Sequence, residues 1–339
     1  MQNAEILNKE PARAQGNPEN PGRLLPLLAA ILAMLGVSVF LYPQAAQWIN
    51  QYRQSRIVEA YSQILDKVEP AEDVQVQEAH RYNKLLESGG LVDIAGHVPT
   101  FRDAAHGLIS TEKAGLRPYN QQLNADGAGL IGRIKVPVAD VDIPIYHGTS
   151  DSTLLQGAGH LQGTALPVGG AGTRTVITAH RGLAQATMFT YLDRVKKGDE
   201  ITLEVFGQVL VYRVFDIQVV QPEDSETIKA VPGKDLATLI TCTPLGINSQ
   251  RIVITGEREL PTPATALKNA GSASDLPHFP WWIVIWLVAL GGSIGFYWFV
   301  RRPKDDAGNS DPAGTRGESV RRADALPGLQ NPPQERVAK

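Results

Sequence analysis

Three side chains that can carry out acyl-transfer chemistry stand at the ends of apolar, strand-like runs. Cys242 ends the run LATLITC, His180 ends the run TRTVITAH, and Arg251 begins a later run after an eight-residue loop. Strand ends beside loops are where a rigid scaffold presents reactive groups. A hairpin around that loop returns Arg251 to Cys242, so the sequence predicts a site containing cysteine, arginine and histidine.

These residue types suit the transfer of an acyl group through a thioester. The thiolate is the nucleophilic form of cysteine, and a nearby imidazole and guanidinium both favour it. Attack by Cys242 on an amide carbonyl forms an oxyanion, which the permanently charged Arg251 can bind. His180 can protonate the departing amine and deprotonate an incoming one. Each residue alone also has a structural interpretation, so spacing alone leaves catalysis open.

The composition excludes several other classes of protein. The net charge of -3 does not predict the strongly basic face of a nucleic-acid-binding protein, so we expect no nucleic acid partner. The acidic residues lack the spacing of a calcium-binding loop, and we expect no metal and no cofactor. The chain has one cysteine, which cannot form an intramolecular disulfide; in an exported protein it is a notable free thiol.

Two uncharged apolar segments, Leu24–Tyr42 and Trp281–Val300, are long enough to cross a membrane. As a helix, the first spans about 28 Å, close to the thickness of the hydrocarbon core. Arg301, Arg302 and Lys304 follow the second, which predicts that this end is cytoplasmic. We therefore expect a two-pass protein of the cell membrane, with both termini cytoplasmic and the central domain extracellular. The alternatives are buried core helices and, for the first segment, a cleaved signal peptide.

The central region changes from helical to strand-like character along the chain. Apolar residues at helical spacing predict two amphipathic helices over residues 44–88, with a break at Glu69-Pro70. After them, short runs rich in Val, Ile, Leu and Thr predict a β-sandwich or barrel, with one short helix near Met188–Val195. The predicted strands are Leu130–Val136, Val141–Tyr146, Thr173–Ala179, Glu200–Val205, Val209–Val220, Leu236–Thr241 and Arg251–Glu257.

Five segments resemble those of a known family in their amino-acid sequence, order and spacing. They read IPIYHGT, GAGHLQGTALPVGG, TVITAHRGL, MFTYLDRVKKGD and TLITCTPLGINSQRIVITGER. The chain resembles the sortase family, and specifically the class C sortases, which assemble pili. The resemblance implies a mainly β fold, an eight-stranded sortase-type barrel with N-terminal helices, here flanked by two transmembrane helices. It also implies the catalytic roles of nucleophile for Cys242, general acid/base for His180 and oxyanion stabiliser for Arg251.

The resemblance further implies the reaction and its partners. A class C sortase is a membrane-anchored transpeptidase of Gram-positive cells that cleaves a C-terminal Leu-Pro-x-Thr-Gly-like sorting signal between Thr and Gly. The pilin or surface-protein substrate is held as a thioester and passed to a lysine amine of the next pilin. Three alternatives stay open: a housekeeping sortase that attaches proteins to peptidoglycan, an L,D-transpeptidase, and a non-catalytic membrane-anchored β-domain scaffold.

One departure from the class C pattern concerns the lid over the active site. Class C sortases often carry an Asp-Pro-aromatic motif in this lid, and the region before the barrel here lacks it. Phe101 and Asp103 are the candidate substitutes. We expect His147 and His160, which lie in resembling segments, to be structural.

The sequence thus divides the chain into eight consecutive parts. They are a disordered cytoplasmic tail (1–22), a transmembrane helix (24–42), amphipathic helices (44–88), a candidate lid loop (89–124), the catalytic barrel (125–262), a linker (263–280), a second transmembrane helix (281–300) and a disordered cytoplasmic tail (301–339).

Overall fold

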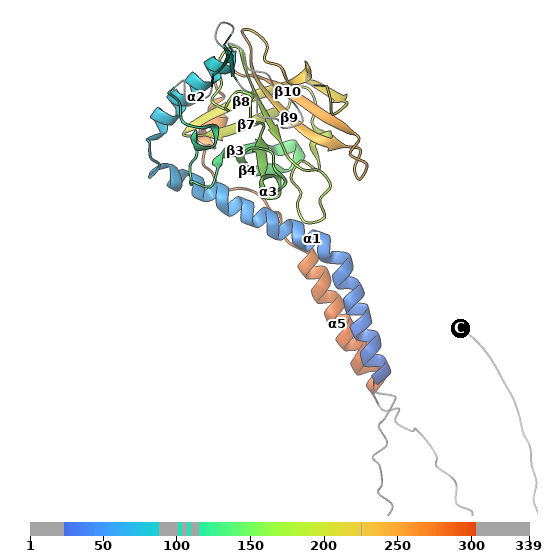
Figure 1. Cartoon of the computed structure of the whole chain (residues 1–339). Helices are drawn as coiled ribbons and strands as arrows, with labels where there is room; N and C mark the ends of the chain where they lie inside the picture. The colour runs from blue at the N-terminus through green and yellow to red at the C-terminus, as the bar shows by residue number, and fades with distance from the viewer. Residues whose placement is uncertain (1–23, 88–100, 104–106, 110–114, 225, 303–339) are drawn as a thin grey trace, which may run out of the picture.

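Eight strands form a closed β-barrel at one end of an elongated molecule (Figure 1). Around the barrel the strand order is β10-β8-β7-β3-β4-β5-β6-β9, in which β4–β5 and β6–β9 are parallel pairs and the other neighbouring pairs are antiparallel. The strands are β3 (Leu130–Val136), β4 (Val141–His147), β5 (Ala158–His160), β6 (Thr173–Thr178), β7 (Glu200–Val205), β8 (Gln208–Val220), β9 (Asp235–Thr243) and β10 (Gln250–Arg258).

This computed structural model describes residues 24–87, 101–103, 107–109, 115–224 and 226–302. The predicted terminal tails lie almost wholly outside these ranges. The expectation of an eight-stranded barrel with N-terminal helices is confirmed.

All seven strands predicted from the sequence are present, and one strand of the barrel was missed. The missed strand, β5, contains three residues, too few to show the alternation that marks a strand. The helix predicted over 188–195 is present only as a 3₁₀ turn, η3 (Leu192–Arg194). Met188 and Phe189 are instead part of a buried connection, which explains their apolar character.

The barrel strands bury apolar side chains on both faces. On β9, Ala237 and Leu239 belong to the large core inside the barrel, whereas Ile240 belongs to a smaller cluster. Because successive side chains of a strand point to opposite faces, the smaller cluster lies on the outer face of the barrel wall. Its members are Leu161, Val176, Val220, Ile228, Ile240 and Val253.

The N-terminal helix α1 (Leu24–Leu65) joins the apolar segment to the barrel without a break in helical structure. It contains Pro43, a residue that kinks helices, and it changes direction below the barrel in Figure 1. Its last turns pack on the barrel through Val58 and Tyr61, and the Tyr61 hydroxyl donates to the Ile131 carbonyl at 2.7 Å. Helix α2 (Glu72–Glu87) buries the face that its sequence pattern predicts.

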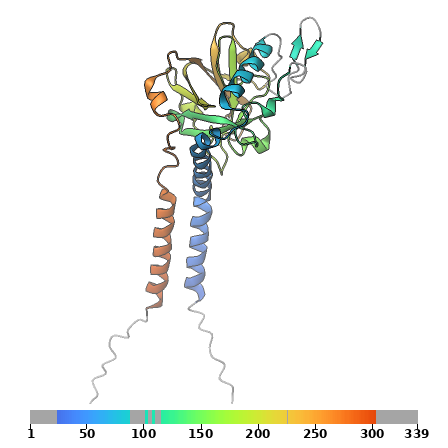
Figure 2. The same ribbon diagram turned by 90° about the vertical axis from the view of Figure 1, so that its left-hand side faces the viewer.

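Among the described residues, two helices are long and apolar enough to cross a membrane: α1 and α5 (Trp281–Arg301). Only 6% of the apolar window of α1 and none of that of α5 is buried inside the protein, which excludes core helices. The two helices lie side by side in both views (Figures 1 and 2), and Trp286 Nε1 donates to Ser38 Oγ at 3.0 Å.

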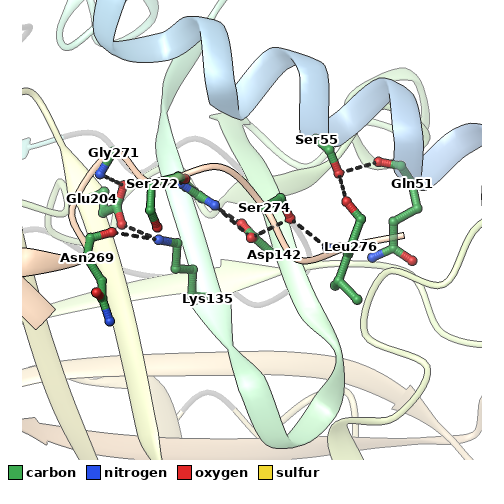
Figure 3. A network of polar contacts seen from close by, with 11 residues as sticks. Gln51, Ser55, Lys135, Asp142, Glu204, Asn269, Gly271, Ser272, Ser274 and Leu276 are labelled. Atoms are coloured by element: carbon green, nitrogen blue, oxygen red, sulfur yellow. Dashed lines mark hydrogen bonds and ion pairs between the residues drawn. The ribbon is translucent and has the colours of Figure 1, made fainter. Parts of the chain in front are cut away.

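The segment between β10 and α5, predicted as a linker, is bonded along the outside of the barrel (Figure 3). It contains a short helix, α4 (Ala264–Lys268). Beyond α4, the Ser272 carbonyl accepts from Arg133 Nη1 at 2.8 Å, and Ser274 Oγ donates to Asp142 at 2.6 Å. The Leu276 carbonyl then accepts from Ser55 of α1 at 2.5 Å. Residues 269–276 therefore strap the barrel to the helix that leads to the membrane.

The candidate lid region contains both core residues and a small hairpin. Leu116, Tyr119 and Leu123, at its C-terminal end, are buried in the main core. Phe101 and Asp103 lie in β1 (Phe101–Asp103), whose backbone pairs with β2 (Gly107–Ile109). The residues on either side of these strands are outside the described ranges, so the lid role of Phe101 and Asp103 stays a prediction.

Candidate active site

Three adjacent strands, β6, β9 and β10, bring the three predicted site residues together. Cys242 lies directly opposite Arg251 in the antiparallel pair β9–β10. In the parallel pair β6–β9, Thr178 lies opposite Ile240. His180 comes two residues after Thr178, just beyond the end of β6, and Cys242 comes two residues after Ile240 on β9, so a continuation of the same register places them side by side.

The hydrogen bonds beyond the end of β6 continue this register. The Ala179 amide donates to the Ile240 carbonyl at 3.4 Å, and the Thr241 hydroxyl donates to the Ala179 carbonyl at 2.8 Å. The backbone next to His180 is therefore tied to the backbone next to Cys242. These bonds end one residue before both functional side chains.

All three side chains lie on the outer face of the barrel wall. Side chains at i and i+2 of a strand, and those directly opposite each other, share a face. Val176 of β6, Ile240 of β9 and Val253 of β10 all belong to the outer cluster. They are separated by four, two and two residues from His180, Cys242 and Arg251, and even separations put each pair on one face. The outer cluster thus forms an apolar floor beside the site.

The functional groups themselves are partly exposed. Cys242, His180 and Arg251 are each of intermediate exposure. Within the described chain, neither the Cys242 thiol nor the His180 ring makes a hydrogen bond, so both can engage a substrate. Arg251 Nη1 donates to the carbonyls of Asn248 and Gln250, both at 3.0 Å, which orients the guanidinium and leaves its other donors for a ligand.

The structure adds a fourth side chain to the site, that of Arg181, for which the sequence predicted no role. Arg181 follows His180, and its side chain is only 6% exposed, which is unusual for arginine. It donates to the hydroxyl of Thr243, the residue after Cys242, at 2.9 Å. Arg181 comes after the strand-like run that ends at His180, in a turn that has no periodic signal, so the sequence did not mark it as buried.

The other histidines of the resembling segments are bonded inside the protein, as expected. His160 is fully buried, and its Nδ1 is 2.8 Å from the Tyr119 hydroxyl while Nε2 donates to the Ala165 carbonyl at 2.9 Å. Both ring nitrogens of His147 lie within 3.0 Å of backbone carbonyls. Burial lowers the pKa of both rings, that of His160 to about 4. In the described part of the chain, no three His, Cys, Asp or Glu residues form a group that could hold a metal.

Comparison with known proteins agrees with this geometry. Residues 134–259 match the sortase domain family. Sortase A of Streptococcus agalactiae is 30% identical over 154 residues, which are 44% of this chain and 60% of that protein. The chain thus spans about three fifths of the length of this curated relative.

Solved structures match over all or nearly all of their length. Sortase C1 of Streptococcus agalactiae is 32% identical, with a TM-score of 0.52, and the match covers 61% of this chain and 100% of that structure. Sortase A of Corynebacterium diphtheriae is 33% identical, with a TM-score of 0.50 and coverage of 73% and 98%. At this identity over whole domains, with the same barrel, the chain belongs to the sortase family.

Proposed function

We propose that this protein is a cysteine transpeptidase in which Cys242 is the nucleophile, His180 the general acid/base and Arg251 the oxyanion stabiliser. The observation that carries the proposal is the register of β6, β9 and β10, which puts these three residue types on one partly exposed face. Membership of the sortase family supports the same roles.

In the first half of the reaction, the Cys242 thiolate attacks the carbonyl carbon of the scissile peptide bond. The new S–C bond pushes the carbonyl electrons onto oxygen, and the Arg251 guanidinium stabilises that negative charge. The C–N bond then breaks, and His180 gives its proton to the departing amine. The products are a thioester on Cys242 and a free amino terminus.

In the second half, an amine replaces the thiolate. His180, now neutral, takes a proton from the incoming amine as the nitrogen attacks the thioester carbonyl. Arg251 stabilises the second oxyanion in the same way, and the C–S bond breaks to restore the Cys242 thiolate. Energy of the peptide bond is conserved in the thioester, so no cofactor is required.

The proposed substrate is a C-terminal sorting signal of the Leu-Pro-x-Thr-Gly kind, cut between Thr and Gly, and the proposed acceptor is a lysine amine of the next pilin. The class C resemblance of the sequence supports pilus polymerisation, as does the match to a protein named sortase C1. Attachment to peptidoglycan differs only in the acceptor amine, and it is therefore an outcome of the test below.

The proposed placement is a barrel on the outer face of the cell membrane, anchored by two spans, with both ends of the chain in the cytoplasm. Helices α1 and α5 run side by side away from the barrel, which supports termini on the same side (Figure 2). Arg301 and Arg302, after the second span, support a cytoplasmic location for that side. On the same grounds, we propose the eight-part division of the chain that its sequence predicts.

Mass spectrometry of the full chain in detergent tests the proposal. The protein is incubated with a Leu-Pro-x-Thr-Gly peptide, with and without a purified shaft pilin, and Cys242→Ala is the matched control. We expect an acyl adduct on Cys242, absent from the control, that becomes an isopeptide bond to a pilin lysine.

The other outcomes separate the alternatives. An adduct that moves only to amines of cell-wall peptides would indicate the housekeeping reaction. If no adduct forms, even after deletion of residues 91–114 of the candidate lid, the catalytic proposal fails and a scaffold remains.

A further inference from the structure

The Arg181 side chain is enclosed between two loops at the site. Its Nε donates to the Thr190 carbonyl at 3.1 Å, and Nη1 donates to Thr243 Oγ1 at 2.9 Å. Nη2 forms an ion pair with Asp193 Oδ2 at 3.1 Å. All three nitrogens of the guanidinium are therefore engaged, as a buried arginine requires.

The loop that receives Arg181 is also tied to its chain neighbours. The Phe189 amide donates to the His180 carbonyl at 3.0 Å, and the Gly182 amide donates to the Thr190 hydroxyl at 3.1 Å. Residues 180–182 are thus each bonded to the segment just before or within η3. Arg181 supplies the side-chain part of that attachment.

Thr243 connects Arg181 to the strand of the nucleophile. It is the last residue of β9 and comes directly after Cys242. The Arg181–Thr243 hydrogen bond therefore joins the residue after His180 to the residue after Cys242. The backbone bonds that continue the β6–β9 pairing end at Ala179 and Thr241, the residues before His180 and Cys242. The Arg181–Thr243 bond therefore ties the two segments together on the other side of the catalytic residues. A displacement of about 1 Å between reacting groups can cost about 10²-fold in rate.

We propose that Arg181 is a positioning residue that fixes the His180 ring relative to the Cys242 thiol. The inference rests on the proposed function, since it concerns how two catalytic side chains are held. It depends on the planar fork of the guanidinium, which reaches three acceptors in different directions. A positive charge alone would not supply this role.

The experiment compares variants of the full chain in detergent. Arg181→Gln removes the charge and most donors, and Arg181→Lys keeps the charge but loses the fork. Thr243→Val removes one acceptor, and Thr243→Ser retains it. Arg194→Gln is the matched control, because Arg194 of η3 also pairs with an aspartate, Asp140, at 2.9 Å, but is 50% exposed, and in the described chain no hydrogen bond or ion pair joins its side chain to residues 180–182 or Thr243.

We expect Arg181→Gln and Arg181→Lys to lower kcat for acyl-enzyme formation by about 10–100-fold, with KM changed less than about twofold. Thr243→Val should lower kcat by about 3–10-fold, Thr243→Ser should recover it, and Arg194→Gln should stay near wild type. Rescue of activity by Arg181→Lys, or a rise in KM with kcat unchanged, would overturn the inference. If the Arg181 variants do not fold, the Thr243 pair decides.

A second readout separates this inference from the proposed function. Alkylation of Cys242 by iodoacetamide needs no peptide substrate, and its rate against pH reports the groups around the thiol. Arg181→Lys, which keeps the positive charge but loses the fork, should shift the midpoint of this profile by at least about half a pH unit, whereas Arg194→Gln should not. An unchanged profile refutes the positioning role, even if the wild type accepts no sorting peptide.

Discussion

His160 predicts a loss of stability in mild acid that can be measured. The ring is fully buried, and burial lowers its pKa from 6.5 to about 4 in the folded protein. Its neutral form fits its partners, because Nε2 donates to the Ala165 carbonyl and Nδ1 accepts from the Tyr119 hydroxyl. Protonation would place a cation in the core and replace an acceptor with a second donor.

The sign and size follow from proton linkage. Between pH 6.5 and 4 the unfolded chain binds a proton at this residue and the folded chain does not, so stability falls as pH falls. With the pKa of His160 near 4, this residue alone removes about 2 kcal/mol at pH 5 and about 3 kcal/mol at pH 4. For a domain of this size, 2 kcal/mol corresponds to about 4–8 °C in Tm.

The assay is thermal and chemical unfolding of the wild type and His160→Gln from pH 7 to 5, followed by the near-ultraviolet dichroism of the buried tyrosines. We expect the variant to be less stable at pH 7 and its deficit to narrow by about 2 kcal/mol at pH 5. His80, whose pKa is also lowered, is present in both proteins, so its contribution cancels in the difference. A constant deficit would refute the reasoning. If the variant fails to fold, the imidazole signal of His160 is followed by NMR in the wild type, and a titration above pH 6 would refute the reasoning.

Three further changes test the site and its supports. Arg251→Lys should lower transpeptidation by about 10²–10³-fold with little change in Tm, because a point charge replaces the fork; near-normal turnover would remove the oxyanion assignment. Asp142→Asn should lower the free energy of unfolding by about 3 kcal/mol in a denaturant titration, because Arg133, 1% exposed, loses its charged bidentate partner; a change under about 1 kcal/mol would contradict this. Tyr61→Phe should cost about 2 kcal/mol in the same titration, since its hydroxyl bonds two backbone groups of the barrel, and equal stability would show that water replaces it.

The sequence predicted those parts of the fold that repeat a pattern. Long β-branched runs identified seven strands, and uncharged stretches identified the two exposed apolar helices. Cys242 and Arg251 were predicted to meet across a hairpin, and the structure places them opposite each other. Whether they and His180 act as proposed stays a prediction.

The rest could not be predicted because it depends on contacts between distant segments. The three residues of β5 become a strand only because β4 and β6 supply partners on both sides. No role was predicted for Arg181, and its burial depends on a turn that has no periodic signal. The attachment of residues 269–276 to the barrel depends on Arg133 and Asp142, which are more than 100 residues away in sequence.

That attachment has a consequence for how the site meets a membrane-tethered substrate. The barrel is bonded to α1 through Tyr61, and the strap from β10 is bonded to both the barrel and α1, through Arg133 and Ser55. With the proposed spans in the membrane, two connections rather than one flexible tether hold the barrel over the bilayer. Cys242 is then restricted in height and direction, so a substrate must bring its sorting signal to the site. Cutting the strap by changing Ser272–Leu276 to a glycine-rich segment should therefore leave hydrolysis of a soluble peptide intact and slow transfer from a membrane-tethered substrate.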